Sequence, residues 1–208
     1  IYVTNGINHD LTDLDFVDFF ANEIIQNMAM TGKRQAIDSI IDKMPKKPLP
    51  NAVYRNKKDL TFEDAGKKWG LDMPSMSNGS AYGDLDNDGD IDIVISNNNG
   101  PANLLIRSGK PEANWIGFDL AGAESNRDAI GTRIKIEANG FSQFKYVNPG
   151  GSYLASNDKR VLFGLDTHSK VNKITIDWPS GKTSAYSDLN SNRYYRVIEG
   201  GEISELFY

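Results

Sequence analysis

The chain has 208 residues, with 23 Lys and Arg against 28 Asp and Glu, two His and no Cys. This acidic balance argues against a general nucleic-acid-binding protein, which needs a basic face. The lack of Cys excludes disulfides, zinc–thiolate sites and Cys nucleophiles, and no run of about 18 apolar residues predicts a transmembrane segment. With 39% hydrophobic and 25% charged residues, the composition is that of a globular protein with one large or two small domains.

The first fifty residues change from strand-like to helical patterning. Residues 1–6 predict a short strand and a turn. Thr12 can cap a helix over 12–31, in which apolar residues recur every three or four positions, namely Val17, Phe20, Ile24 and Met28. A second helix is predicted over 34–44, because Pro45 and the prolines after it would end it. We expect this helical segment, at about 10–44, to be an insertion outside any sheet.

From residue 51 onward the patterning is mostly that of β-strands. Strands are predicted at 51–55, 91–96 and 103–107, and the sequence Gly-Lys-Pro-Glu at 109–112 is typical of a linker. Seven more short strands are predicted at 115–120, 132–138, 141–147, 160–163, 171–178, 183–186 and 194–198.

The C-terminal strands predict a separate domain. The pair Asn139-Gly140 lies between two alternating runs and indicates a two-residue hairpin. Trp115 and Trp178 lie in apolar strands and are expected to be buried. We therefore predict an antiparallel β-sandwich over 113–199, followed by a C-terminal tail over 200–208.

Two short segments of the chain are similar to two later ones. Residues 1–5 (Ile-Tyr-Val-Thr-Asn) align with 93–97 (Ile-Val-Ile-Ser-Asn), and 51–55 align with 103–107. The simplest account is a repeated strand–turn–strand unit with the helices inserted in its first copy, the alternative being chance similarity. Because the acidic stretch precedes the strand of the second copy, its counterpart in the first copy would fall before Ile1. We therefore expect the chain to begin inside a repeat of a longer protein. Its first strand would then pair within the chain or self-associate through the truncated edge.

The most informative segment is the acidic loop, residues 84–92, which contains five alternating aspartates: Asp84, Asp86, Asp88, Asp90 and Asp92. Ca²⁺ binds about six to eight oxygen atoms, which a tightly wrapped loop can supply. We expect the carboxylates of the first three, the carbonyl of Asp90 and the carboxylate of Asp92 to be ligands, with Gly89 allowing the chain to reverse. An EF-hand would need Glu where Ile95 stands, so the loop is EF-hand-like and lies between strands.

Alternatives to a calcium loop are weaker. Mg²⁺ prefers a tight octahedron that retains several waters, and an ordinary acidic turn would not place Gly and alternating Asp in this order. We favour a bound ion that only stabilises the loop over a catalytic role. The chain has no G-x-S-x-G, H-E-x-x-H or G-x-G-x-x-G motif, so we assign no catalytic residue.

Two other groups of residues have alternative interpretations. The cluster Ser125-Asn-Arg-Asp128 is either a polar binding site or, as we favour, a turn in which Arg127 pairs with a carboxylate. Several tyrosines could form a sugar-stacking platform, but at strand spacing they more often lie in the core or in cross-strand pairs: Tyr146, Tyr153, Tyr186, Tyr194 and Tyr195.

These motifs resemble two known families. The pieces Phe62-Glu-Asp-Ala65, Trp69-Gly-Leu71, Ser77-Asn-Gly-Ser-Ala81 and Gly83 to Asp92 resemble an FG-GAP/VCBS-type repeat. The C-terminal part resembles the ASPIC/UnbV domain in its sequences Asn114-Trp-Ile116, Ser125 to Gly131, Gly150-Gly-Ser-Tyr-Leu154, Phe163-Gly-Leu165 and Trp178-Pro-Ser-Gly181. Proteins with this combination are similar to the cartilage acidic protein family, and bacterial relatives are mostly exported.

The resemblance implies both a fold and a function. The fold would be mainly β, with partial propeller blades over 1–108 followed by the sandwich, and a full-length relative would form a seven-bladed propeller. The expected function is a non-enzymatic, calcium-binding extracellular or cell-surface binding or adhesion module, located outside the cell or in the periplasm. Its ligand would be a protein or a glycan. The alternative is a carbohydrate-binding module of a glycan-handling protein.

Overall fold

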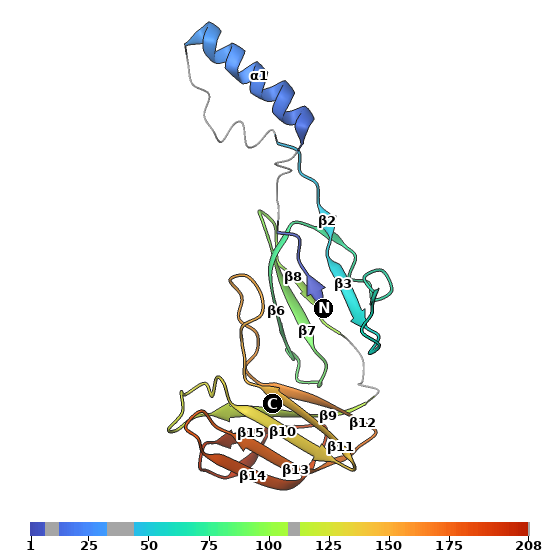
Figure 1. The fold of residues 1–208 in the computed structure, drawn as a ribbon, viewed down its shortest axis with the longest axis vertical. Coiled ribbons are helices and arrows are strands. Elements are labelled where there is room, and N and C mark those ends of the chain that lie inside the picture. Colours follow the sequence, from blue (N-terminus) through green and yellow to red (C-terminus); the bar gives the residue numbers. More distant parts are fainter. Residues whose placement is uncertain (7–12, 33–43, 108–112, 208) are drawn as a thin grey trace. The chain divides into compact units, whose positions relative to one another are not determined.

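The structure, a computed structural model, describes residues 1–6, 13–32, 44–107 and 113–207 and is mainly β (Figure 1). The chain divides into two compact units, one of Ile1–Gly79 with Ile95–Asn103 and the other of Ser80–Val94 with Leu104–Tyr208. The acidic loop therefore belongs to the same compact unit as the C-terminal strands. The linker predicted at 109–112 and almost all of the helix predicted at 34–44 fall outside the described residues. The domain boundary between 108 and 113 stays a prediction.

Helix α1 (Leu14–Thr31) confirms the first predicted helix. Its N-cap is Asp13 rather than Thr12, because Asp13 Oδ1 accepts the backbone N–H of Phe16 at 3.0 Å. Gly32 ends the helix with a φ of 66°, and its N–H donates to the carbonyl of Met28 at 2.9 Å. Within the described part of the chain, no helix is long and apolar enough to cross a membrane.

Along the chain, short strands precede and follow helix α1. Strands β1 (Tyr2–Val3), β3 (Ala52–Asn56) and β4 (Phe62–Asp64) form a sheet in that order, and β2 (Leu49–Pro50) pairs with β5 (Pro74–Ser75). Strands β1 and β3 are antiparallel, with Tyr2 opposite Val53. The N-terminal strand thus pairs within its own chain, which is one of the two outcomes expected for it.

The acidic loop connects two strands of a separate sheet. Strands β6 (Ser77–Gly83), β7 (Asp92–Asn97) and β8 (Asn103–Leu105) form this sheet in chain order. Strands β7 and β8 are neighbours, just as β1 and β3 are, so the two aligned segments of each proposed repeat copy lie side by side. The flanks of the loop are therefore strands, as the sequence predicts, and not the helices of an EF-hand.

The C-terminal part is built from two four-stranded sheets (Figure 1). One has the order β11 (Phe141–Tyr146), β10 (Arg133–Ala138), β13 (Lys170–Asp177) and β14 (Thr183–Asn190). The other has the order β12 (Val161–Asp166), β9 (Asn114–Ala121), β15 (Tyr194–Ile198) and β16 (Ile203–Leu206).

One hydrophobic core joins the two sheets of this sandwich. Alternate side chains of β10 and β13 are buried, as in the Ile134–Ile136 and Ile174–Ile176 pairs, and they pack in one cluster with Phe118 and Phe163. The rings of Phe118 and Phe163 meet edge to face, with centroids 6.1 Å apart. Each fully buried side chain of this size contributes roughly 1.5–3 kcal/mol of transfer free energy to folding.

Local turn signals in the sandwich agree with the structure. Asn139 and Gly140, with φ of 39° and 91°, form the two-residue hairpin between β10 and β11, where Ala138 pairs with Phe141. The tight turn at Pro179 is closed by the N–H of Gly181, which donates to the carbonyl of Trp178 at 2.9 Å.

The second sheet differs from the expected arrangement in two ways. Strands β9 and β15 run parallel, with Tyr194 opposite Gly117, whereas the other pairs in the sandwich are antiparallel. Strand β16 lies in the segment assigned to a C-terminal tail and pairs with β15. The turn at Gly200 and Gly201 permits this reversal, because Gly200 has a φ of 71° and the N–H of Gly201 donates to the carbonyl of Ile198 at 2.9 Å.

Candidate metal centre

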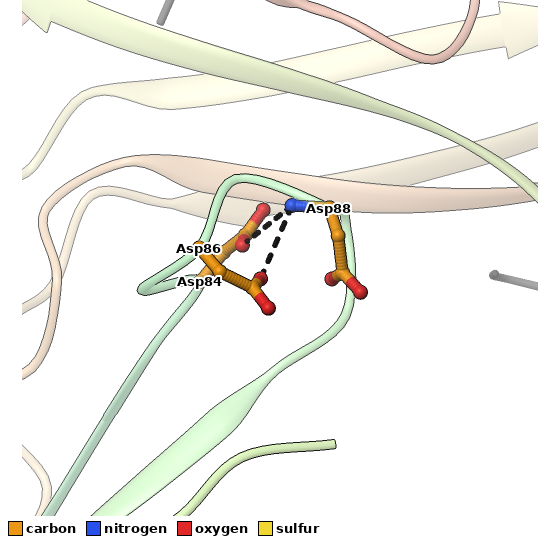
Figure 2. Close-up of side chains that lie close together, drawn as sticks. All are labelled: Asp84, Asp86 and Asp88. Carbon is orange, nitrogen blue, oxygen red and sulfur yellow. Dashed lines mark hydrogen bonds between the residues drawn. The ribbon is translucent and has the colours of Figure 1, made fainter. Parts of the chain in front are cut away.

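Three of the five predicted ligands lie together in the acidic loop. Carboxylate oxygens of Asp84, Asp86 and Asp88 are all within 4.8 Å of one another. Figure 2 shows the backbone N–H of Asp88 directed at the other two carboxylates, with distances of 3.1 Å to Asp84 Oδ1 and 3.3 Å to Asp86 Oδ1. Three carboxylates this close on a short wrapped loop form a hard-oxygen donor set that could hold a metal ion.

The other two aspartates brace the loop instead of joining this cluster. Both carboxylate oxygens of Asp92 accept backbone N–H groups, from Leu85 at 2.8 Å and from Arg107 at 3.0 Å. The side chain of Asp90 pairs with the guanidinium of Arg107 at 2.9 Å. The Asp90 carboxylate is thus engaged by a cation of the chain itself. The assignment of the Asp90 carbonyl and the Asp92 carboxylate as ligands stays a prediction.

The electrostatics of the loop favour a cation. Partial desolvation, followed by the neighbouring carboxylate of Asp88, raises the pKa of Asp86 above its usual range. Desolvation also raises the pKa of Asp90, although the nearby Arg107 opposes this shift. Negative charges held this close disfavour one another, and a divalent ion relieves the repulsion directly.

Two loop residues have the left-handed backbone conformation. Asn87 has a φ of 63° and Gly89 a φ of 91°. At Gly89 there is a second reason for glycine, because an added Cβ would lie 2.1 Å from Trp115 Cε2. The predicted chain reversal at Gly89 and the predicted burial of Trp115 are both confirmed. The contact between them has no local signal in the sequence.

Residues of the sandwich complete the surroundings of the loop. The hydroxyl of Tyr194, in β15, donates to Asp84 Oδ2 at 2.7 Å. Arg160, just before β12, donates to Asn87 Oδ1 at 2.6 Å and to the backbone carbonyl of Asp84. The sequence connects neither residue with the loop, because they are about 75 and 110 positions from their partners in it. Tyr194 is noted there only as one of several tyrosines.

The Ser125–Asp128 segment is a structural turn. Ser125 binds the buried carboxylate of Glu199, and Asn126 closes the turn through two hydrogen bonds of 2.8 Å to the backbone of Ile130. The expected pairing of Arg127 with a carboxylate is wrong for the described residues. The nearby carboxylates form ion pairs with lysines: Asp128 with Lys159 at 2.6 Å, and Glu124 with Lys182.

Two family models match different parts of the chain. Residues 46–95, which include the acidic loop, match the family model described as FG-GAP-like repeat. Residues 122–204, which include most of the sandwich, match the model described as ASPIC and UnbV. These two segments are thus similar to an FG-GAP-like repeat and to an ASPIC/UnbV domain, and both resemblances seen in the sequence are confirmed.

One curated relative has a similar segment. Cartilage acidic protein 1 from Homo sapiens is 41% identical over 59 residues. This match covers 28% of the present chain and 9% of the relative. The chain thus corresponds to a small part of that protein's length.

Proposed function

We propose that this chain is a calcium-binding, non-enzymatic binding or adhesion module of a protein that acts outside the cytoplasm. The observation that carries the proposal is the convergence of the Asp84, Asp86 and Asp88 carboxylates in a loop between two strands. The FG-GAP and ASPIC/UnbV families are not known as catalytic domains, which supports a binding role. The ligand would be a protein or a glycan, and the calcium ion would stabilise the loop that supports its binding surface.

Thermal melting tests whether the chain binds calcium. An ion that binds only the folded chain raises its stability, by about 2.7 kcal/mol at a concentration near one hundred times Kd. Millimolar Ca²⁺ should therefore raise Tm relative to EDTA, and Asp88→Ala should remove most of this increase. Asp72→Ala is the matched control, since it removes an exposed aspartate outside the loop. A wild-type Tm that does not change between EDTA and Ca²⁺ would overturn the proposal.

The proposed location follows from the family match. FG-GAP repeats are typically extracellular or periplasmic, so we place the protein at the cell surface, in the periplasm or outside the cell, where Ca²⁺ is abundant. Protease added to intact cells, or to cells whose outer membrane alone has been opened, should then degrade the protein. Protection of the protein until the cytoplasmic membrane is lysed would contradict this location.

A second candidate is carbohydrate binding. A cavity of about 350 Å³ lies beside the acidic loop. Its lining includes aromatic, amide and cationic side chains as well as one isoleucine: Tyr82, Ile91, Lys145, Tyr146, Asn148 and Arg160. Tyr82 and Tyr146 are about half exposed, and exposed aromatic rings beside amide and cationic donors suit the stacking and hydrogen bonding of a sugar. On a glycan array, Tyr146→Ala should weaken the signal, whereas Tyr153→Ala, an exposed tyrosine outside the cavity, should not.

A further inference from the structure

The sandwich contributes a buried hydrogen bond to the acidic loop. Tyr194 and Asp84 are each 2% exposed, and the Tyr194 hydroxyl donates to Asp84 Oδ2 at 2.7 Å. Burial and this hydrogen bond raise the pKa of Tyr194 above its ordinary value, so the phenol remains neutral and continues to donate. A hydrogen bond to an ionised acceptor in a buried position is among the stronger ones in proteins.

This hydrogen bond decides which oxygen of Asp84 is available to a cation. Oδ2 accepts two donors, the Tyr194 hydroxyl at 2.7 Å and the N–H of Gly89 at 2.8 Å. Oδ1 accepts one, the N–H of Asp88 at 3.1 Å. Because a carboxylate oxygen has about two lone-pair directions, Oδ2 is saturated and Oδ1 keeps one direction for an ion. Tyr194 therefore fixes the rotation of the first predicted ligand.

Two neighbours hold the Tyr194 ring and the loop in place. The guanidinium of Arg160 lies over this ring, with its Cζ 4.6 Å from the centroid, while the same side chain donates to Asn87 and Asp158. On the other side, the ring centroid of Trp115 is 5.1 Å from that of Tyr194, and Trp115 contacts Gly89. The loop and the sandwich thus pack against each other through Arg160, Tyr194 and Trp115.

We propose that Tyr194 of the ASPIC/UnbV domain is a positioning residue for the cation site of the FG-GAP loop. This inference rests on the proposed function, because it requires that the loop binds Ca²⁺. With Asp84 held by Tyr194, the loop is preorganised, and binding of the ion and docking of the loop on the sandwich are coupled. By thermodynamic reciprocity, each then strengthens the other by the same factor.

Calorimetric titration of the full chain with CaCl₂ tests the proposal. Tyr194→Phe removes only the hydroxyl, and loss of a partner that orients a metal ligand typically weakens affinity about 10–100-fold. Tyr195→Phe is the matched control, because the neighbouring hydroxyl bonds only to the backbone of Asn190, at 3.1 and 3.2 Å. We expect a weaker affinity for Tyr194→Phe and an unchanged one for Tyr195→Phe. Equal affinities in the two variants would overturn the positioning role.

A second measurement separates this inference from the proposed function. In EDTA, hydrogen exchange of the Asp88 and Gly89 amides reports whether Asp84 still accepts them. Exchange should be at least several-fold faster in Tyr194→Phe than in Tyr195→Phe, because the Asp84 carboxylate can then rotate. If wild type binds no Ca²⁺, the proposed function fails, while faster exchange would still show that Tyr194 positions Asp84. Unchanged exchange in both variants would refute the positioning role.

Discussion

Glu199 accepts two hydrogen bonds from Ser125, one from its backbone N–H at 2.6 Å and one from its hydroxyl at 3.0 Å. The same carboxylate accepts the N–H groups of Ala123 and Glu124 and the hydroxyl of Ser180. It thereby ties the turn after β9 and the turn after β13 to the end of β15. The polar residues at 125–128, which the sequence alone could assign to a binding site, thus hold a structural glutamate in place.

These hydrogen bonds make the sandwich sensitive to acid. Burial opposes ionisation of Glu199, but the donors from Ser125, Ser180, Ala123 and Glu124 outweigh it and lower its pKa to about 2. Because the folded pKa lies below the ordinary value of 4.5, this carboxylate stabilises the fold above that value and loses its contribution as the pH falls towards 2. Melting curves from pH 2 to 7 should show a shallower acid dependence in Glu199→Gln than in wild type.

The control for that experiment is Glu202→Gln. Glu202 is an exposed glutamate three positions away, so its substitution changes the net charge equally without touching the turns. It should leave the acid dependence as in wild type. If Tm falls equally towards low pH in wild type and in Glu199→Gln, the Glu199 hydrogen bonds do not contribute to the pH dependence.

How far the sequence predicts this structure depends on how local each signal is. The hairpin at Asn139-Gly140 and the strand after it follow from neighbouring residues, because positive φ and alternation are properties of a few consecutive positions. Strand β16 was missed because Ile-Ser-Glu-Leu does not alternate apolar and polar residues, and the strand forms by pairing with the edge of β15.

The candidate site shows the same division. The aspartate spacing predicts a cation loop, and the structure brings three of the carboxylates together. That Asp92 accepts the N–H of Arg107, and that Tyr194 holds Asp84, are relations between distant segments. They depend on how the loop packs on the sandwich, which no local pattern encodes.

Gly89→Ala should destabilise the second compact unit more than its backbone strain alone would. The Cβ would meet the Trp115 indole at 2.1 Å, in addition to requiring a φ of 91° from a residue that rarely adopts it. Gly140→Ala is a close control, because Gly140 has the same φ and nothing lies within 4 Å of its Cβ. Strain of this kind costs roughly 1–3 kcal/mol. In urea unfolding with EDTA, Gly89→Ala should lose clearly more stability than Gly140→Ala, and equal losses would contradict the close packing of loop and indole.

Phe163→Ala should test whether the two sheets share one core. Phe163 is fully buried and meets Phe118 from the same sheet, within the cluster that includes β10 and β13 of the other sheet. Removing a buried Phe side chain costs roughly 3–5 kcal/mol, whereas Phe207→Ala removes an exposed ring and should change little. Urea unfolding of both variants gives the comparison. A loss below about 1 kcal/mol for Phe163→Ala would show that the cluster is not a tightly packed core.

A fragment of residues 113–208 should fold alone but lack the response to Ca²⁺. Every buried residue of the sandwich core lies between Ile116 and Val197, so the fragment keeps its whole core. It loses the acidic loop, and with it the cover over Trp115 and Tyr194. We therefore expect a dispersed NMR spectrum and a Tm below that of the full chain. Calcium should raise the Tm of the full chain only. An unfolded spectrum would place the domain boundary before the acidic loop, because the sandwich would then need the loop to fold.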